Sequence, residues 1–520
     1  MKYIYIYDTT LRDGSQSEGV NFTVNEKILI TEKLNDFGFD FIEGGWPGSN
    51  PKDEEYFAKI KKIKLKSKVV AFSATHMKVK TAETDVLLQK VLAAETKYIT
   101  VFGKVWDLHT RKILGVSDSE ALDLISNTIK FLIKNKRKVI FDAEHCFDGW
   151  KSNPKFTLAC LRAAEGAGAM NLTLCDTNGG SLPSELGKII SEIKKKIKTP
   201  LGIHTHNDSG VAVANSIIAV ENGVNLIQGT INGIGERTGN ANLNTIIADL
   251  QLKKGMKILP PAKLAQLTNL ANYVYEIGNK RPKNDQPFVG KNAFTHKGGI
   301  HVSAVAKIPA SYEHIDPKLV GNHTNITISE LSGKSNVIAV AQRLGIKIQS
   351  DSPQIREILA QVKDLENQGF YYETAEASFA LLILHSEKDY KKPFELQEYC
   401  VSNSSAGGVD ATVEVKVKGK LRKFSASGNG PVNALDLALR QGIEEFFPQT
   451  KNVELTDYKV RILDTHSATA AKTRVLIESS NGKEDWKTVG CSENIIKASW
   501  QALSDSLEYA IWRSGKKVEK

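Results

Sequence analysis

An alternating pattern in the first 235 residues constrains the fold of this chain more than any other feature. Eight short apolar runs, rich in β-branched and aromatic residues, alternate with longer amphipathic segments such as 24–38 and 154–168. Strands alternating with helices predict parallel βα units, and eight such units are typical of a TIM barrel. An open doubly wound sheet is the alternative, but no G-x-G-x-x-G motif follows the first run. The runs are YIYIYDTT, FDFIEGG, KVVAFSAT, KYITVFGK, KVIFDAEH, MNLTLCDTNGG, LGIHTHND and NLIQGTINGIG.

The 520 residues are too many for one ordinary core, so we expect further domains. The barrel is predicted over 1–255, and a helical linker region over 256–368. Beyond this region, runs of alternating apolar and polar residues with two interposed amphipathic segments predict an α+β domain over 369–520. Its strands are expected in ASFALLILHS (377–386), ATVEVKVKG, KVRILDTHS and KTRVLIES, with helices near 431–446 and 494–512.

Composition excludes several classes of function. No apolar run approaches the roughly 18 residues that a membrane helix needs, so we expect no membrane partner. The net charge is +10, but the lysine runs lie where helices are expected to end, and no aromatic residues are interleaved with them. We therefore expect no nucleic-acid partner. Five scattered cysteines without a C-x-x-C pair predict reduced thiols and a cytoplasmic protein.

Polar residues cluster at the carboxyl end of every predicted strand, which in a TIM barrel is the active-site face. His204 and His206 stand two apart in HTHND, so both point to one face of a strand. Asp13 adds a carboxylate with Arg12 beside it, and Asn240 offers an amide oxygen. Alone, these could be hydrogen-bonded histidines, an Asp-Gly turn and an Asn that tolerates positive φ. Together they predict a divalent metal site for Mg²⁺, Mn²⁺, Co²⁺ or Zn²⁺.

The chain resembles the family of 2-isopropylmalate, homocitrate and citramalate synthases. The resemblance covers nearly the whole chain and rests on spaced motifs that occur in the same order. The matching segments are DTTLRDGSQSEG (8–19), CDTNGG (175–180), HTHND (204–208), GTINGIGERTGNANL (229–243), GKNAFTHKGGIHVSAV (290–305), GNGPVNALDLAL (428–439) and VGCSENIIKASWQAL (489–503).

The resemblance implies a role for each candidate residue. It implies four metal ligands: Asp13, His204, His206 and Asn240. It implies that Arg12 polarises the oxo group of a 2-oxo acid with Gln16 beside it, and that Thr177 binds the carboxylate. It also implies an acid–base apparatus and a positioning group, formed by Glu144, His301 and Tyr312. In this family the segment with His301 and Tyr312 reaches into the partner's barrel, so a homodimer is expected.

The activity that the resemblance implies is a Claisen-type condensation of acetyl-CoA with a 2-oxo acid. Pyruvate is the expected oxo acid, giving (R)-citramalate and CoA for isoleucine synthesis. The alternative is 2-oxoisovalerate, giving 2-isopropylmalate for leucine synthesis. A hydroxymethylglutaryl-CoA-type lyase is disfavoured because NGIGERTGN contains no cysteine. A non-catalytic amino-acid sensor is disfavoured by the intact metal-ligand pattern. For the C-terminal domain we expect an allosteric, dimerising role, with isoleucine as effector and leucine as the alternative.

Two departures from the family pattern bear on these expectations. His145 follows Glu144 where relatives often have Asp. The long EGGWPGSNP segment (43–51) resembles one branch of citramalate synthases. The bulky side chains Trp46, Phe72, Phe102 and Trp106 would narrow the substrate pocket if they face inward, and would otherwise pack against the barrel helices.

Overall fold

The computed structural model describes residues 3–349, 352–405 and 407–515 of the chain. These residues form two compact units. The first comprises the residues up to 294 together with 315–323, and the second comprises 295–314 and the residues from 324 onwards. The boundaries expected at 255 and 368 are not tested by this division and stay predictions.

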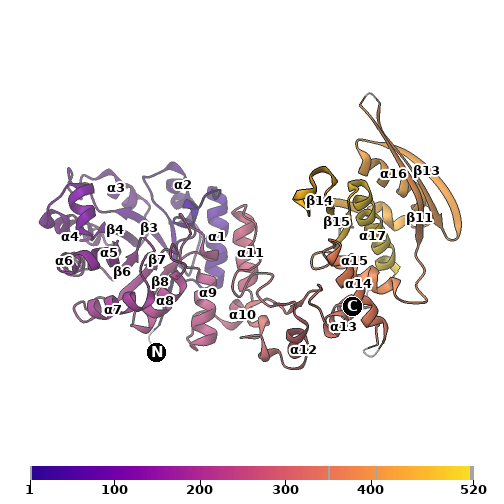
Figure 1. Cartoon of the computed structure of the whole chain (residues 1–520). Helices are drawn as coiled ribbons and strands as arrows, with labels where there is room; N and C mark the ends of the chain where they lie inside the picture. Colours follow the sequence, from indigo (N-terminus) through magenta and orange to yellow (C-terminus); the bar gives the residue numbers. More distant parts are fainter. Residues whose placement is uncertain (1–2, 350–351, 406, 516–520) are drawn as a thin grey trace. The chain divides into compact units, whose positions relative to one another are not determined.

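The first unit contains a closed barrel of eight parallel strands in sequence order, so the predicted TIM barrel is confirmed. Strand β1 closes the barrel on β8, with Tyr5 opposite Leu226 and Asp8 opposite Gly229. Figure 1 shows the strands surrounded by helices. The strands are β1 (Tyr5–Asp8), β2 (Phe41–Gly45), β3 (Lys68–Ala74), β4 (Tyr98–Lys104), β5 (Lys138–Glu144), β6 (Asn171–Asp176), β7 (Leu201–Thr205) and β8 (Leu226–Gly229).

Local signals explain where the barrel helices begin and end. Helix α1 (Val24–Phe37) begins at a capping box of Thr23 and Glu26 and ends at Gly38, whose φ of 95° suits glycine. The other helices of this unit are α2 (Pro51–Ile60), α3 (Val86–Ala93), α4 (Asp118–Lys134), α5 (Cys146–Ser152), α6 (Pro154–Gly166), α7 (Pro183–Lys194), α8 (Ala212–Glu221), α9 (Leu243–Ala248), α10 (Pro261–Leu264) and α11 (Leu267–Ile277).

The barrel interior is divided into an apolar layer and a polar layer. The apolar layer is a cluster of its own, to which five strands contribute one residue each: Tyr7, Phe41, Val70, Ile140 and Leu226. Most of these residues lie near the amino ends of their strands, so they fill that end of the barrel. The carboxyl ends are left to polar side chains, which is where the candidate site forms.

The second unit combines helices with two antiparallel sheets. Its helices are α12 (Gly299–Lys307), α13 (Lys334–Arg343), α14 (Gln354–Asn367), α15 (Glu376–His385), α16 (Pro431–Ile443) and α17 (Ile495–Gly515). One sheet has the order β11 (Phe394–Ser404), β12 (Gly408–Val417) and β13 (Lys420–Gly428), and the other has β14 (Glu454–Ile462), β15 (Thr473–Ser480) and β16 (Asp485–Ser492). Two short strands, β9 (Thr295–His296) and β10 (Asn325–Ile326), pair in parallel.

One predicted strand is wrong. All of the run ASFALLILHS except its last residue lies within helix α15, and every residue from Ala377 to Leu384 is buried. A wholly buried helix shows no amphipathic period, so its sequence cannot be distinguished by periodicity from that of a buried strand. The run contains Ala and Leu, which favour helices, and Ile383 is its only β-branched residue. The expected α+β character of this domain is nevertheless confirmed.

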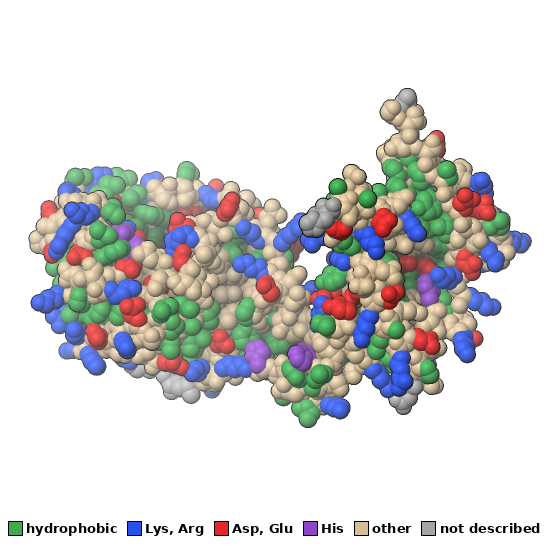
Figure 2. All heavy atoms as spheres, in the orientation of Figure 1, with side chains coloured by type: hydrophobic (Ala, Val, Ile, Leu, Met, Phe, Trp, Pro, Cys, Tyr) green, Lys and Arg blue, Asp and Glu red, His purple; other side chains and the backbone are tan. Residues whose placement is uncertain are grey.

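Three further observations concern the surface charges, the cysteines and the length of the apolar helices. Figure 2 shows Lys and Arg side chains scattered among acidic ones on the visible face. All five cysteines are free thiols, and Cys400 is the exposed one. Within the described ranges, no helix has the length and apolar character needed to cross a membrane.

Candidate active site

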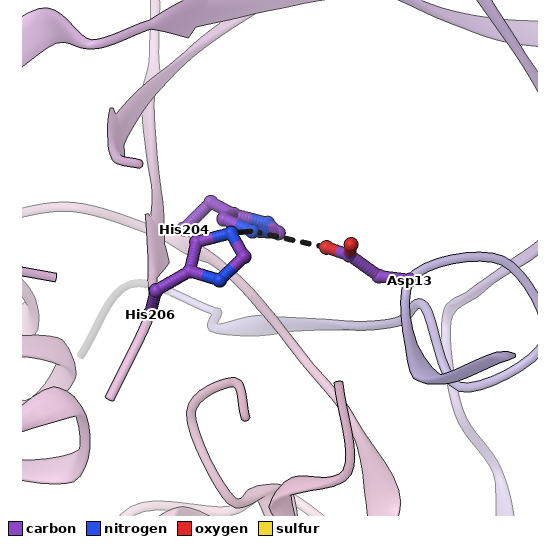
Figure 3. Close-up of side chains that lie close together, drawn as sticks. All are labelled: Asp13, His204 and His206. Atoms are coloured by element: carbon purple, nitrogen blue, oxygen red, sulfur yellow. Dashed lines mark hydrogen bonds and ion pairs between the residues drawn. The ribbon is translucent and has the colours of Figure 1, made fainter. Parts of the chain in front are cut away.

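Three predicted metal ligands converge at the carboxyl ends of β1 and β7. His204 lies on β7, His206 is the first residue after that strand, and Asp13 lies in the turn after β1. The His204 Nε2 atom is 3.2 Å from Asp13 Oδ2 and 3.3 Å from His206 Nε2. All three residues are buried, and their ligand atoms lie within 4.8 Å of one another. Figure 3 shows the side chains pointing toward one another.

The protonation states of two members of this cluster suit a cation, whereas the pKa of His204 is raised because Asp13 outweighs burial. Burial alone would raise the pKa of Asp13, but Arg12 and His204 lower it by a larger amount. The pKa of Asp13 therefore lies well below its usual range. Burial and the neighbouring His204 lower the pKa of His206 to about 4. Asp13 is therefore ionised and His206 is neutral near neutral pH, which are the states that bind a metal ion.

Asn240 completes the cluster and shows that the residues fit a cation. Its Nδ2 donates to Asp13 Oδ2 at 2.9 Å and lies 3.3 Å from His204 Nε2, while its Oδ1 is buried without a hydrogen-bond partner. His206 Nδ1 is also buried without a partner. Rotating this amide by half a turn would aim its oxygen at the cluster. In that orientation a bound cation would give the Asn240 oxygen the partner that it lacks.

Two residues behind the cluster fix the orientation of His204. The His204 Nδ1 atom is 2.8 Å from Gln228 Oε1, and Gln228 Nε2 donates to Asp142 Oδ1 at 2.9 Å. Because an amide oxygen only accepts, Nδ1 carries a proton, and Nε2 faces Asp13 and the rest of the cluster. Burial, together with the Glu43 carboxylate, raises the pKa of Asp142 to about 7.

Arg12 is held rigidly beside the cluster. Its Nε donates to Glu43 Oε1 at 2.5 Å, its Nη1 is 3.2 Å from Asp13 Oδ1, and its guanidinium carbon is 3.8 Å from the Phe72 ring centre. Glu43 is fully buried and also accepts hydrogen bonds from Tyr7 and Thr9. The guanidinium therefore needs little reorganisation to stabilise negative charge at this point.

Glu144 and Thr177 lie at the ends of neighbouring strands. Glu144 Oε2 is 2.6 Å from Lys104 Nζ, and the two residues are register partners on β5 and β4. Thr177 Oγ1 accepts a hydrogen bond of 2.8 Å from the His145 backbone, and the Thr177 carbonyl accepts one of 2.8 Å from Arg237. Both predicted residues thus face the same pocket as the metal cluster.

The pocket has a volume of about 220 Å³ and one aromatic wall. Trp46 lies with its ring centre 5.7 Å from both Phe72 and Phe102, whose rings stack at 5.3 Å. All three residues line the pocket, so they face inward and do not pack against the barrel helices. Trp106 does not line this pocket and stacks on His109 instead. Gln16 is exposed and also lines this pocket.

His301 and Tyr312 belong to the second unit. Their rings stack with centres 4.2 Å apart, and both side chains are exposed. The neighbouring Glu313 is buried, faces His296 Nε2 at 3.4 Å and accepts a hydrogen bond from Thr324 at 2.6 Å. The structure thus brings these two predicted residues to each other.

Eight of the predicted residues therefore cluster at the barrel mouth, namely Arg12, Asp13, Gln16, Glu144, Thr177, His204, His206 and Asn240. Sequence reasoning missed Glu43, Lys104, Asp142 and Gln228 as functional residues. The usable signal for Asp142 was strand alternation, since it stands two residues before Glu144 and shares its face. The chemical roles of all these residues stay predictions.

Comparison with known proteins agrees with this architecture. Residues 3–274 match the family model described as HMGL-like, 288–369 match the homocitrate synthase post-HMGL domain-like model, and 373–511 match the LeuA allosteric (dimerisation) domain. The barrel and its polar mouth thus define a protein of the HMGL-like class.

Relatives similar over their full length narrow the family. An (R)-citramalate synthase of Aquifex aeolicus is 48% identical over 98% of both chains. One of Geobacter sulfurreducens is 48% identical over 99% of this chain and 98% of the relative. A 2-isopropylmalate synthase of Methanocaldococcus jannaschii is 31% identical over 97% of this chain and 94% of the relative. The chain belongs to the family of the (R)-citramalate synthases, and the family prediction is confirmed.

Proposed function

We propose that the chain is an acyltransferase that condenses acetyl-CoA with pyruvate to form (R)-citramalate and CoA. The observation that carries the proposal is the convergence of Asp13, His204 and His206 beside Arg12 at the mouth of an HMGL-like barrel. The full-length relatives named (R)-citramalate synthase support the same reaction. The 2-isopropylmalate synthase in the comparison is the more distant relative, at 31% identity.

A divalent metal held by Asp13, His204, His206 and Asn240 would act as a Lewis acid on the oxo acid. Arg12 would stabilise the negative charge that develops on the oxo oxygen, because Glu43 and Phe72 hold its guanidinium in place. The carboxylate of the oxo acid would accept hydrogen bonds at Thr177, with Gln16 at its edge.

Glu144 is proposed to remove a proton from the methyl group of acetyl-CoA. Its carboxylate contacts Lys104, its register partner on the neighbouring strand, which holds it at the pocket. The carbanion equivalent attacks the oxo carbon, and hydrolysis of the thioester then releases CoA. We propose that His301 and Tyr312 complete the acid–base apparatus from the partner subunit of a homodimer.

The aromatic wall supports pyruvate over 2-oxoisovalerate. Trp46, Phe72 and Phe102 occupy the side of the pocket next to Arg12. Their rings leave less room for an isopropyl group than for a methyl group. Overpacking of a closed site costs about 1–3 kcal/mol, or roughly one to two decades in rate.

The experiment is a free-thiol assay on the purified full chain with a divalent metal, acetyl-CoA and pyruvate. We expect CoA release that depends on pyruvate and a product with the mass and chirality of (R)-citramalate. Reactions without pyruvate, and reactions after metal removal, are the controls. Absence of pyruvate-dependent CoA release in a folded, metal-loaded protein would refute the proposal.

Regulation is proposed to reside in the C-terminal part of the chain. Residues 373–511 match a domain described as allosteric and dimerising, which supports a homodimer with an amino-acid effector. We propose isoleucine as the effector, with leucine as the alternative, and a cytoplasmic location consistent with five free thiols. A chain truncated near residue 370 should lose inhibition by both amino acids. Equal sensitivity of the truncated and full chains would refute this assignment.

A further inference from the structure

Arg237 lines the pocket at the barrel mouth, but neither the predicted roles nor the comparisons assign a function to it. Its Nε donates to Asp208 Oδ1 at 2.8 Å, and its Nη2 donates to Asp208 Oδ2 at 3.0 Å. The same Nη2 also donates to the carbonyl of Thr177 at 2.8 Å. The pair Asp208 and Arg237, hereafter the clamp, therefore connects the loops that follow β6, β7 and β8.

Backbone contacts bring these three loops close enough for the clamp to form. Ser209 N donates to the Gly179 carbonyl at 3.0 Å, which joins the loop after β7 to the loop after β6. Asn207 N donates to the Gly239 carbonyl at 2.9 Å, which joins the loop after β7 to the loop after β8. Gly179 has a φ of 61°, and a Cβ atom at this position would collide with Asp208. Asp208 therefore packs directly against the loop after β6.

Both polar ends of Thr177 are held in place. Arg237 binds its carbonyl, and His145 N donates to its Oγ1 at 2.8 Å. The next residue, Asn178, donates to Asp148 Oδ2 at 2.9 Å, which ties the same loop to α5. A hydroxyl that accepts one hydrogen bond still has its own proton to donate. Because Thr177 lines the pocket, this proton is available to a ligand there.

The geometry favours a supporting role for Arg237 over direct contact with the oxo acid. Its Nε proton and both Nη2 protons are engaged by Asp208 and Thr177. Its Nη1 lies 3.5 Å from Glu236 Oε2. The φ of Arg237 is 56°, in the left-handed region that residues other than glycine rarely adopt. Such a backbone persists where the surrounding contacts fix it, as the three donor contacts do here.

We propose that the clamp positions Thr177 to donate its hydroxyl proton to the carboxylate of the oxo acid, and thereby sets the affinity for the oxo acid. A hydroxyl on an unrestrained loop would lose part of its binding energy to the ordering of that loop. The clamp orders the loop before the oxo acid binds. The inference rests on the proposed function, in which Thr177 binds that carboxylate.

The first test is the kinetics of the full chain with Arg237→Lys, which keeps the positive charge but loses the planar fork. We expect the KM for pyruvate to rise about tenfold, the size of one hydrogen bond to a charged group. The kcat and the KM for acetyl-CoA should change little, because uniform binding of the oxo acid is lost. Asp208→Asn should give the same pattern, and it carries the comparison if Arg237→Lys fails to fold.

The chain offers a matched control for the loss of an arginine fork. Arg111 donates from Nε and Nη2 to the two carboxylate oxygens of Asp118, at 3.0 and 2.8 Å, and neither residue lines the mouth pocket. Arg111→Lys breaks this exposed fork in the same unit and should leave the kinetics of the original chain unchanged. An equal rise in the KM for acetyl-CoA in Arg237→Lys would indicate general loosening of the mouth and would overturn the proposal.

A cycle of double variants shows whether the clamp acts through Thr177. Thr177→Val removes the hydroxyl and should itself raise the KM for pyruvate. Adding Arg237→Lys to Thr177→Val should raise this KM little further, because the group that the clamp positions is already absent. A further rise of the same size as in Arg237→Lys alone would show that Arg237 acts by another route, and the proposal would be wrong.

Binding without turnover keeps this test separate from the test of the reaction. Calorimetric titration of the Mg²⁺-loaded full chain with pyruvate, without acetyl-CoA, should show affinity about tenfold weaker in Arg237→Lys and Asp208→Asn than in Arg111→Lys. Thermal melting followed by circular dichroism identifies the folded variants. Equal pyruvate affinity in these folded variants would overturn the proposal. If the chain released no CoA but pyruvate binding weakened in the clamp variants alone, the proposed reaction would fail while the clamp stood.

Discussion

The barrel mouth and the segment with His301 and Tyr312 hold their candidate residues in opposite ways. At the mouth, Asp13, His204 and Asn240 are buried and linked by contacts of 2.9 to 3.3 Å. In the second unit, His301 and Tyr312 stack on each other with exposed side chains. The first set is held together by hydrogen bonds within one unit, whereas the second set is exposed on the other unit.

This difference separates the proposed binding of metal and oxo acid at the mouth from the proposed acid–base groups of the second unit. We propose that the buried, hydrogen-bonded set binds a metal and an oxo acid with little rearrangement beyond rotation of the Asn240 amide. An exposed aromatic pair has no such function alone, and its assignment as a partner's contribution follows from the family resemblance. Variants at the two places should therefore behave differently.

The largest effect is expected at the mouth. Asp13→Ala or His204→Ala removes a ligand of the predicted metal. A metal acting as a Lewis acid supplies several kcal/mol of transition-state stabilisation. We expect kcat to fall at least about 10⁴-fold, while circular dichroism shows an intact fold. Asp36→Ala, an exposed carboxylate in the same unit, is the matched control. Strong residual turnover in the metal-stripped chain would contradict the metal site.

The next effect tests the second unit against the mouth. Glu144→Gln and His301→Ala each remove one proposed acid or base and should lower kcat about 10²–10⁴-fold, with a smaller change in KM. If His301 acts across the dimer, mixing the two inactive variants should restore activity in heterodimers, because one barrel then has both groups. Verified heterodimers without any restoration would show that His301 does not serve the partner's barrel.

A smaller effect is expected at the residue behind His204. Gln228→Leu removes the acceptor that fixes the His204 proton on Nδ1. Loss of such an outer partner typically lowers metal affinity about 10–100-fold. A titration of the metal-free chain with Co²⁺, followed by absorbance, measures this directly, with the exposed Gln89→Leu as control. Equal Co²⁺ affinity in both variants would deny Gln228 a positioning role.

The mouth could be predicted from sequence for a physical reason. Parallel strands bring their carboxyl ends to one face, so Asp13 and Asn240 were expected together although 227 residues separate them. The supporting residues Glu43, Lys104 and Gln228 were not predicted as functional, because an inward-facing strand residue carries no local signal of its partner. Their contacts depend on strand register, which the sequence pattern does not reveal.

The second unit was less predictable for the same kind of reason. Helix α15 has buried residues along its whole length from Ala377 to Leu384, so it carries no period that distinguishes it from a strand. His301 and Tyr312 lie on α12 and just after a short turn, and no regular repeat of elements points to them. Only the resemblance to a family of known activity identified them as candidates.

The measurement that tests the central claim most directly is a panel of 2-oxo acids in the free-thiol assay. The aromatic wall of Trp46, Phe72 and Phe102 narrows the pocket beside Arg12. We predict a kcat/KM for pyruvate at least about tenfold above that for 2-oxoisovalerate, a difference of roughly 1.4 kcal/mol in transition-state binding. An equal or higher kcat/KM for 2-oxoisovalerate in the same assay would contradict the account and identify the chain as a 2-isopropylmalate synthase.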